Sequence, residues 1–249
     1  MNIRWLVPDW PAPPPVRALS TLRDGGVSAP PYASLNLGAH VGDQPQAVTE
    51  NRRRLREAAD LPAEPLWLSQ VHGTRVLDLD GAQVSGPADG ALTRRPGRVC
   101  AVLTADCLPI LLAGTAGDGV AVAHAGWRGL STGVIEATVG ALGVDPASLL
   151  AWLGPAIGPR HFEVGAEVRD ALLKDDPEAG AAFEKGPRDR FMADLYALAR
   201  RRLRRLGIEQ IYGGGECTYA QSDRYFSYRR DALTGRQATL IWLTETAGR

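Results

Sequence analysis

The stretch VCAVLTADCLPILL at residues 99–112, followed by GVAVAHAGWRG at 119–129, decides how the fold is interpreted. Short runs of aliphatic and β-branched residues, interrupted by Asp, Pro and Gly, are typical of buried strands with sharp ends. Cys107 follows the first apolar run, and His124 closes the run that begins at Gly119. Both side chains are therefore expected at strand ends, at the edge of a sheet, rather than in the middle of a core.

Strands and helices alternate on either side of these two stretches. Asp43 is expected as the N-cap of the first helix, with Pro45 in its first turn, and Gly143 is expected to end the second. The predicted strands are Val99–Leu103, Pro109–Leu112, Gly119–His124, Leu149–Leu153, Glu209–Tyr212 and Ala238–Leu243, and the predicted helices run from Asp43 to Ala59, Gly129 to Gly143, Gly165 to Leu173 and Asp194 to Leu206. This alternation predicts a layered α/β or α+β sandwich.

The chain organisation is simple. No internal repeat and no long linker is apparent, so residues 1–249 are expected to form a single domain. The charged stretch from Lys174 to Arg190 is expected to be a mobile surface excursion, and Pro11–Pro15 an extended lead-in.

Composition excludes several classes of partner. The formal net charge is zero and the isoelectric point is about 6.9, which gives no electrostatic footprint for nucleic acid. No apolar run is long enough to span a membrane, and the N-terminal residues lack the apolar core of a signal peptide. Three cysteines cannot all pair with one another, so we expect a reduced, cytoplasmic protein.

A metal site is expected where Cys107 and His124 meet His72, which lies in QVHGTR at 70–75. The chain has only four histidines, and His40 and His161 lack the strand-end setting and are interpreted as peripheral. Two imidazoles and one thiolate supply three of the four ligands of a tetrahedral zinc site and leave the fourth position open.

Two arginines are candidates for binding an anion. Arg52 falls between Val48 and Leu55 on the apolar stripe of the first helix, where a guanidinium needs either a structural carboxylate or a ligand anion. Arg128 lies in the turn after His124, beside the expected N-terminus of a helix.

Two other classes of function use the same residues. In a Cys–His hydrolase, Cys107 would be the nucleophile and His124 its base, and His72 would have no role. In a non-catalytic binder, a structural zinc would be closed by a fourth protein ligand, for which Cys100 and Cys217 are the candidates.

Eight motifs occur in order along almost the whole chain, from about Arg17 to Leu243. They are SLNLG at 34–38, NR at 51–52, QVHGT at 70–74, ADG at 88–90, TADCLP at 104–109, HAGWRG at 124–129, GPAIGP at 154–159 and SYRRD at 227–231. Together they closely resemble the laccase-domain family, also called the peptidoglycan editing factor or multifunctional purine nucleoside phosphorylase family.

The resemblance implies an α/β sandwich of mixed sheets flanked by helices, similar to the cysteine hydrolase fold of the cytotoxic necrotizing factor catalytic domain. It implies zinc bound by His72, Cys107 and His124, although copper can occupy such donors in vitro. The family's activities imply phosphorolysis of adenosine, inosine and methylthioadenosine, adenosine deamination, and editing of UDP-muropeptide precursors. The expected partners are thus small substrates and phosphate, with the chain a monomer or weak homodimer.

Roles can be assigned for phosphorolysis. Arg52 and Arg128 would position phosphate, and Asn36 would hold a ribose hydroxyl or the base. Asp106 or Glu163 would act as acid or base.

The older description of the family as multicopper oxidases fits the residues poorly. A four-copper enzyme needs many histidines, usually in His-x-His pairs, and this chain has four histidines and no such pair.

Overall fold

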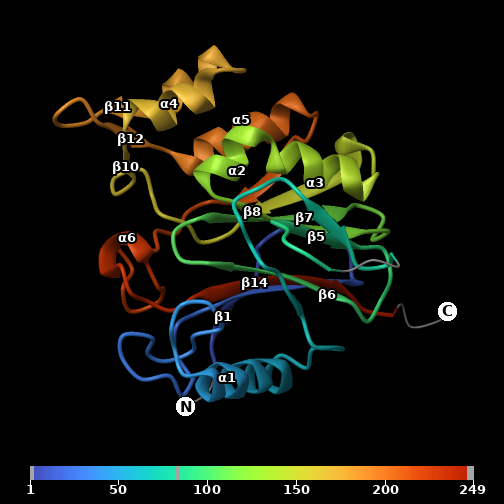
Figure 1. Cartoon of the computed structure of the whole chain (residues 1–249). Coiled ribbons are helices and arrows are strands. Elements are labelled where there is room, and N and C mark those ends of the chain that lie inside the picture. Colours follow the sequence, from blue (N-terminus) through green and yellow to red (C-terminus); the bar gives the residue numbers. More distant parts are fainter. Residues whose placement is uncertain (1–2, 82–84, 246–249) are drawn as a thin grey trace.

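The computed structural model describes residues 3–81 and 85–245, which form two stacked β-sheets with helices on both outer faces (Figure 1). The expected mixed α/β architecture is confirmed. One sheet has the strand order β1-β2-β14-β6-β3 and the other β13-β9-β7-β8-β5-β4. Both sheets mix parallel and antiparallel pairs: β3 is parallel to β6, and β13 to β9, while β7 is antiparallel to β8.

The strands of the first sheet are Trp5–Leu6 (β1), Val16–Thr21 (β2), Leu66–Trp67 (β3), Val99–Thr104 (β6) and Gln237–Leu243 (β14). Those of the second are Val76–Asp78 (β4), Gly90–Thr93 (β5), Leu108–Gly114 (β7), Val120–Ala125 (β8), Leu149–Leu153 (β9) and Gln210–Gly213 (β13). A small third sheet joins Glu163–Val164 (β10), Phe191–Ala193 (β12) and Phe183–Lys185 (β11).

Both faces of the central strands are covered, which explains their unbroken apolar sequences. In β6, Cys100 and Val102 belong to the cluster between the sheets, while Val99, Ala101 and Leu103 pack on the side of helix α1 (Pro45–Ala58). Successive side chains of a strand point to opposite faces, so a strand between two layers must be apolar at every position. All six residues of β6 are buried.

The helices follow the sequence predictions with two differences. Helix α1 has Gln44 rather than Asp43 as its N-cap, because the Asp43 carboxylate bonds the Ser28 hydroxyl and the Asn36 amide instead. The second predicted helix begins earlier and is broken in two, α2 (Trp127–Thr132) and α3 (Val134–Leu142), at Gly133, whose φ of 99° is incompatible with a continuous helix. The other helices are α4 (Ala166–Leu173), α5 (Leu195–Arg205) and α6 (Tyr228–Asp231).

The charged stretch from Lys174 to Arg190 is not simply a surface excursion, which corrects the prediction. It contains a 3-10 helix, Pro177–Ala182, and strand β11. Arg201 of α5 contacts the carboxylates of Asp176 and Glu178, so the stretch is tied to the helical layer by charge.

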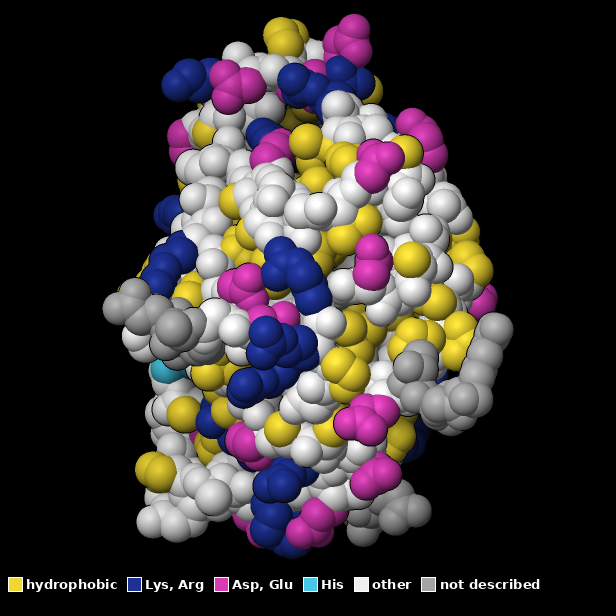
Figure 2. Space-filling model, turned by 90° about the vertical axis from the view of Figure 1, so that its right-hand side faces the viewer, with side chains coloured by type: hydrophobic (Ala, Val, Ile, Leu, Met, Phe, Trp, Pro, Cys, Tyr) yellow, Lys and Arg dark blue, Asp and Glu magenta, His cyan; other side chains and the backbone are white. Residues whose placement is uncertain are grey.

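The surface agrees with the neutral net charge. On the face drawn in Figure 2, acidic and basic side chains are interspersed and do not form a broad field of one sign. Among the described helices, none is both long and apolar enough to cross a membrane.

Candidate metal centre and active-site cavity

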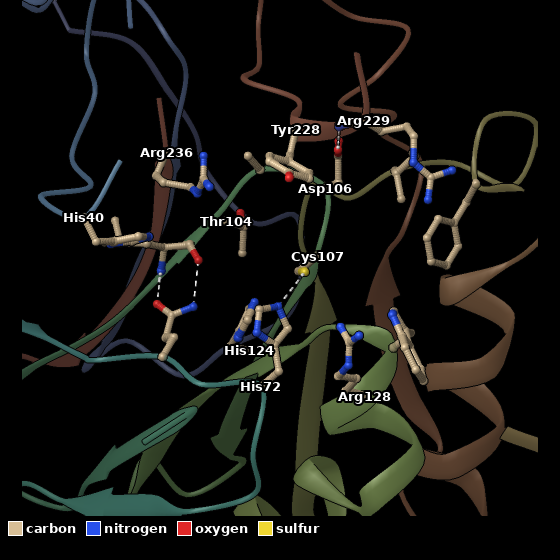
Figure 3. Close-up of a pocket in the computed structure, with 16 residues that line it drawn as sticks. His40, His72, Thr104, Asp106, Cys107, His124, Arg128, Tyr228, Arg229 and Arg236 are labelled. Atoms are coloured by element: carbon tan, nitrogen blue, oxygen red, sulfur yellow. Dashed lines mark hydrogen bonds between the residues drawn. The ribbon is translucent and has the colours of Figure 1, made fainter. Parts of the chain in front are cut away.

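Three separate segments of the chain bring the candidate ligands together, which are His72, Cys107 and His124. Cys107 precedes β7, His124 lies near the end of β8, and His72 lies in the loop after β3. The candidate ligand atoms of the three side chains all lie within 4.8 Å of one another, and the Cys107 Sγ is 3.8 Å from the His72 Nε2 (Figure 3). The structure thus brings together the three predicted ligands, with Cys107 and His124 at strand ends and His72 in a loop.

Asp89 organises this group from behind. One of its carboxylate oxygens accepts hydrogen bonds from the His124 Nδ1 (2.8 Å) and the His72 backbone N–H (2.9 Å). The other accepts from the backbone N–H groups of Gly73 (2.7 Å) and Val71 (3.1 Å). This fully buried carboxylate therefore leaves the second ring nitrogen of His124 free to face Cys107 and fixes the loop that carries His72.

The charges of these groups are coupled. Burial alone would raise the pKa of Asp89, but the hydrogen bonds from His124, Gly73 and Val71 outweigh it and hold that pKa below its ordinary value. Burial likewise opposes ionisation of Cys107, yet attraction to His124 and hydrogen bonds from His124 and His72 lower the pKa of the thiol. Against burial, Cys107 and Asp89 raise the pKa of His124. The site favours a thiolate, the form of cysteine that binds metal or attacks an electrophile.

The backbone around the site is held in rarely used conformations. His72 has φ of 59° and Asp106 has φ of 93°, both in the left-handed region that side chains other than glycine seldom adopt. Such conformations persist only where surrounding contacts impose them, and they are concentrated at functional sites.

Gly126 leaves room for the ligands to converge. A Cβ atom at this position would lie 2.8 Å from the His72 Cδ2 and 3.0 Å from the Cys107 Sγ, closer than non-bonded atoms tolerate. The glycine at the N-cap of α2 is thus a spatial requirement of the site.

The three residues open into a cavity of about 410 Å³, a volume suited to a small organic ligand. Its wall includes Gln70, whose amide pairs with both backbone groups of Leu103 and so ties the His72 loop to β6. It also includes Thr104, whose buried Oγ1 has no hydrogen-bond partner among the described residues. This hydroxyl is available to a ligand.

Three arginines line the cavity: Arg128, Arg229 and Arg236. Each guanidinium lies against an aromatic ring, and none forms a salt bridge with a carboxylate within residues 3–81 and 85–245. Figure 3 shows Arg236 and Arg128 on different sides of the Cys107 group, with Arg229 above it. The cavity is therefore positively charged, although the protein as a whole is neutral.

The other predicted substrate residues lie elsewhere. Arg52 donates two hydrogen bonds to the Leu37 carbonyl, at 3.1 and 2.8 Å, and stacks over the Trp67 ring. Asn36 is fully buried and accepts hydrogen bonds from the backbone N–H groups of Gly38 and Arg236. Neither residue lines the cavity, so the structure does not support the prediction that they touch substrate.

The two candidate acids differ in position. Asp106 lines the cavity, but one carboxylate oxygen accepts from the Thr218 hydroxyl and the other from the Arg229 backbone N–H, both at 2.6 Å. Glu163 is an exposed residue of β10 outside the cavity wall, and its carbonyl accepts from the Arg229 side chain. Both residues position Arg229.

Sequence reasoning missed several residues of the cavity. His40 was interpreted as peripheral, but the structure places it in the wall beside Arg236. Tyr228, Arg229 and Arg236 come from the C-terminal part of the chain, and only SYRRD at 227–231 gave a signal. The role of Asp89 was also missed, although its carboxylate stands in the motif ADG at 88–90.

The donor set fits a catalytic metal rather than a closed structural one. Among the described residues, His72, Cys107 and His124 are the group of three that a metal would need, and the other two cysteines lie away from it. Cys100 is buried between the sheets, and Cys217 contacts His161 in another cavity. Three nitrogen and sulfur donors with a carboxylate behind one histidine fit a transition metal such as zinc or copper and leave one position of a tetrahedral shell open.

Comparison with known proteins places these features in a family. A purine nucleoside phosphorylase of Escherichia coli, YfiH, is 56% identical over 239 residues, which cover 96% of this chain and 98% of that protein. A purine nucleoside phosphorylase of Pseudomonas aeruginosa is 55% identical, over 97% of this chain and 99% of the relative.

Solved structures agree with the fold. The crystal structure of a Neisseria meningitidis protein superposes with a TM-score of 0.92 at 48% identity and covers 97% of this chain and 99% of that one. YlmD from Geobacillus stearothermophilus superposes with a TM-score of 0.89 at 34% identity, and the match covers 97% of this chain and 96% of that one. A family model described as multi-copper polyphenol oxidoreductase laccase matches residues 17–244. The chain belongs to this laccase-like family.

Proposed function

We propose that this protein is a zinc-dependent purine nucleoside phosphorylase that acts on adenosine, inosine and methylthioadenosine, with adenosine deamination as a side activity. The names of its relatives support the phosphorylase assignment. The observation that carries it is the lining of one cavity by the His/Cys/His group and by three guanidinium groups that form no salt bridge with any described carboxylate. Guanidinium groups bind phosphate through paired, charge-assisted hydrogen bonds.

In phosphorolysis a phosphate oxygen attacks the anomeric carbon of the ribose. The bond from that carbon to the purine breaks, and the departing base keeps the electron pair and takes up the proton that the attacking hydrogen phosphate loses. Arg128, Arg229 and Arg236 would hold phosphate beside the sugar, which removes the entropic cost of bringing the two together. The unpartnered Thr104 hydroxyl would bond the nucleoside, and the exposed ring of Tyr228 would contact its base.

Asp106 would keep Arg229 in place rather than transfer a proton, because both of its carboxylate oxygens are engaged. A zinc ion held by His72, Cys107 and His124 would supply Lewis-acid polarisation of a substrate atom and, for deamination, activation of water. Copper oxidase chemistry fits the residues less well, because the four histidines are divided between two cavities.

One experiment tests this proposal directly. Zinc-loaded protein, checked by elemental analysis, is incubated with adenosine or inosine with and without phosphate, and the products are separated. We expect release of free base and formation of ribose 1-phosphate only with phosphate, and a slower, phosphate-independent conversion of adenosine to inosine. Neither base nor inosine appearing at full zinc loading would refute the nucleoside assignment.

A second candidate is a cysteine hydrolase acting on a peptide-like bond of a muropeptide precursor. The specific observation in its favour is the line from Asp89 through His124 to Cys107, the order of groups in a catalytic triad. This proposal also retains the predicted likeness to the cytotoxic necrotizing factor fold. His72 discriminates between the two: His72→Phe should abolish phosphorolysis but leave an amidase active.

A further inference from the structure

A second thiol–imidazole pair lies in a different cavity. The Cys217 Sγ is 3.5 Å from the His161 Nδ1 and accepts a hydrogen bond from the Gly158 backbone N–H at 3.2 Å. The His161 ring stacks on Tyr219, with centroids 4.7 Å apart and an angle of 20° between the planes. Both Cys217 and His161 line a cavity of about 570 Å³ that shares no lining residue with the cavity of Cys107.

This setting differs from that of an inert cysteine. The imidazole can take the thiol proton, and its stacking on Tyr219 fixes the ring that does so. The Gly158 N–H stabilises negative charge on the sulfur. Cys100 provides the contrast within the same chain: it is fully buried between the sheets, and burial raises the pKa of its thiol. Accessibility and a neighbouring base are what make a cysteine reactive.

One side of the Cys217 sulfur is closely covered. A Cβ at Gly158 would lie 3.1 Å from the Cys217 Sγ, so the loop at 154–159 covers the thiol closely on that side. The remaining approach is from the cavity, whose wall also carries Arg160 and Arg200.

We propose that Cys217 is a modification site, a second reactive thiol that a small hydroperoxide oxidises with His161 as the base. His161 takes the thiol proton, and the sulfur attacks one peroxide oxygen. The sulfur–oxygen bond forms as the oxygen–oxygen bond breaks. Sulfur loses two electrons and the peroxide gains them. With hydrogen peroxide the departing hydroxide takes the proton back from His161, and the products are sulfenic acid and water.

The sulfenic acid has no nearby cysteine with which to form a disulfide among the described residues. Cys100 is enclosed between the sheets, and Cys107 lies in the other cavity. The modified side chain is therefore expected to persist or to take up a low-molecular-weight thiol from solution. This inference does not depend on the proposed phosphorylase activity.

Peptide mapping tests the proposal on the whole zinc-loaded protein. The protein is treated with hydrogen peroxide in the presence of dimedone, which adds to sulfenic acids, and is then digested with trypsin. Cys217 falls in the peptide 206–224, while Cys100 and Cys107 fall together in 99–128, so the two regions are read separately. We expect a dimedone adduct on 206–224 in the folded protein. An adduct there only after denaturation would overturn the proposal.

The role of His161 is tested by two variants. His161→Phe keeps an aromatic ring against Tyr219 but removes the ring nitrogens, and His161→Gln keeps polarity without an imidazole. Both should slow modification of 206–224 at least tenfold and leave that of 99–128 unchanged, with thermal melting recorded to verify folding. Modification of 206–224 at the wild-type rate in both folded variants would show that His161 does not activate the thiol and would overturn the proposal.

Discussion

Cys107 and Cys217 are both half-buried cysteines with an imidazole beside the sulfur, yet their surroundings differ in three respects. Cys107 has two histidines, and Cys217 has one. The histidine behind Cys107 is held by the buried carboxylate of Asp89, whereas His161 rests on the ring of Tyr219. Finally, three arginines line the Cys107 cavity, whereas two, Arg160 and Arg200, line the Cys217 cavity.

The difference shows what would separate the proposed metal centre from the proposed reactive thiol. A carboxylate behind an imidazole fixes which ring nitrogen is free and makes it a better ligand, and a second imidazole supplies the third donor. Without these, one imidazole can only take a proton from the sulfur. The same pair of residue types thus supports two kinds of chemistry, and the neighbours decide which.

The largest expected effect comes from removing the sulfur itself. Cys107→Ala should lose bound zinc and lower kcat/KM for phosphorolysis by about a thousandfold or more, as expected when a group of the reacting centre is lost. Cys217→Ala is the matched control and should keep both zinc and activity. Elemental analysis measures the zinc content of each variant, and inosine phosphorolysis measures its activity. Equal zinc in both variants would erase the distinction between the two cysteines.

The charge of the Cys107 cavity is tested by Arg236→Met. If Arg236 holds phosphate as proposed, its removal should lower kcat/KM by about a hundredfold, the scale of one charge-assisted contact in a dry site. The saturating concentration of phosphate should rise.

Arg52→Met is the matched control for Arg236→Met. It should keep its activity but lower the free energy of unfolding by about 1–2 kcal/mol, because the Leu37 carbonyl loses its donors. Denaturant titration and kinetics separate the two results. Loss of activity at unchanged stability in the Arg52 variant would instead show that Arg52 contributes to substrate binding.

The role of the carboxylate behind the imidazole is tested by Asp89→Asn. An amide cannot accept all four hydrogen bonds that the carboxylate accepts, so His124 and the His72 loop lose their fixed orientation. Zinc affinity, measured by chelator competition, should fall by about 10- to 100-fold.

Asp194→Asn is the corresponding control, because Asp194 lines the Cys217 cavity and caps α5 through the Ala197 N–H. Asparagine is an equally good N-cap, so zinc affinity should not change. A similar loss of zinc in both variants would mean that Asp89 has no special relation to the metal.

The smallest expected effect concerns the space around the ligands. Gly126→Ala places a methyl group against His72 and Cys107, and an overpacking cost of about 1.4 kcal/mol, near the lower end of the usual range, would weaken zinc binding about tenfold. The backbone at Gly126 has φ of −66°, so alanine is not strained there.

Gly140→Ala, on the exposed side of α3 with nothing within 4 Å of the new Cβ, is the control. It should leave zinc binding unchanged and increase the free energy of unfolding by about 0.5–1 kcal/mol. Equal zinc affinity in both variants would show that the ligands can move away from the added methyl group.

Some of the fold could be read from local pattern. The strand at 149–153 matches its prediction at both ends, and the helix predicted from Asp194 to Leu206 is α5, which begins one residue later and ends one residue earlier. Strands β2 and β5 were missed, since VRALST and GALT are too short and mixed to stand out from a loop. The break at Gly133 was missed for a related reason: one glycine is tolerated inside a helical pattern, and only its positive φ shows that the helix stops.

The candidate site shows the same division. Arg52 lies on the buried stripe of α1 as the sequence predicts, but α1 covers the outer face of its sheet, so inward there does not mean toward the cavity (Figure 1). No sequence pattern identified Arg236 as a cavity residue. It directly precedes strand β14, and its side chain lines the cavity.

The sequence by itself determined the layered α/β class, the buried strands and the three candidate donor residues, because these depend on residue type and on spacing along the chain. Only the tertiary structure decided which carboxylate stands behind His124, which arginines face the ligands and which partner each cysteine has. Those relations join residues far apart in the chain, such as Asp89 with His124 and Gly158 with Cys217. They follow from strand order and loop path, which local residue preferences do not specify.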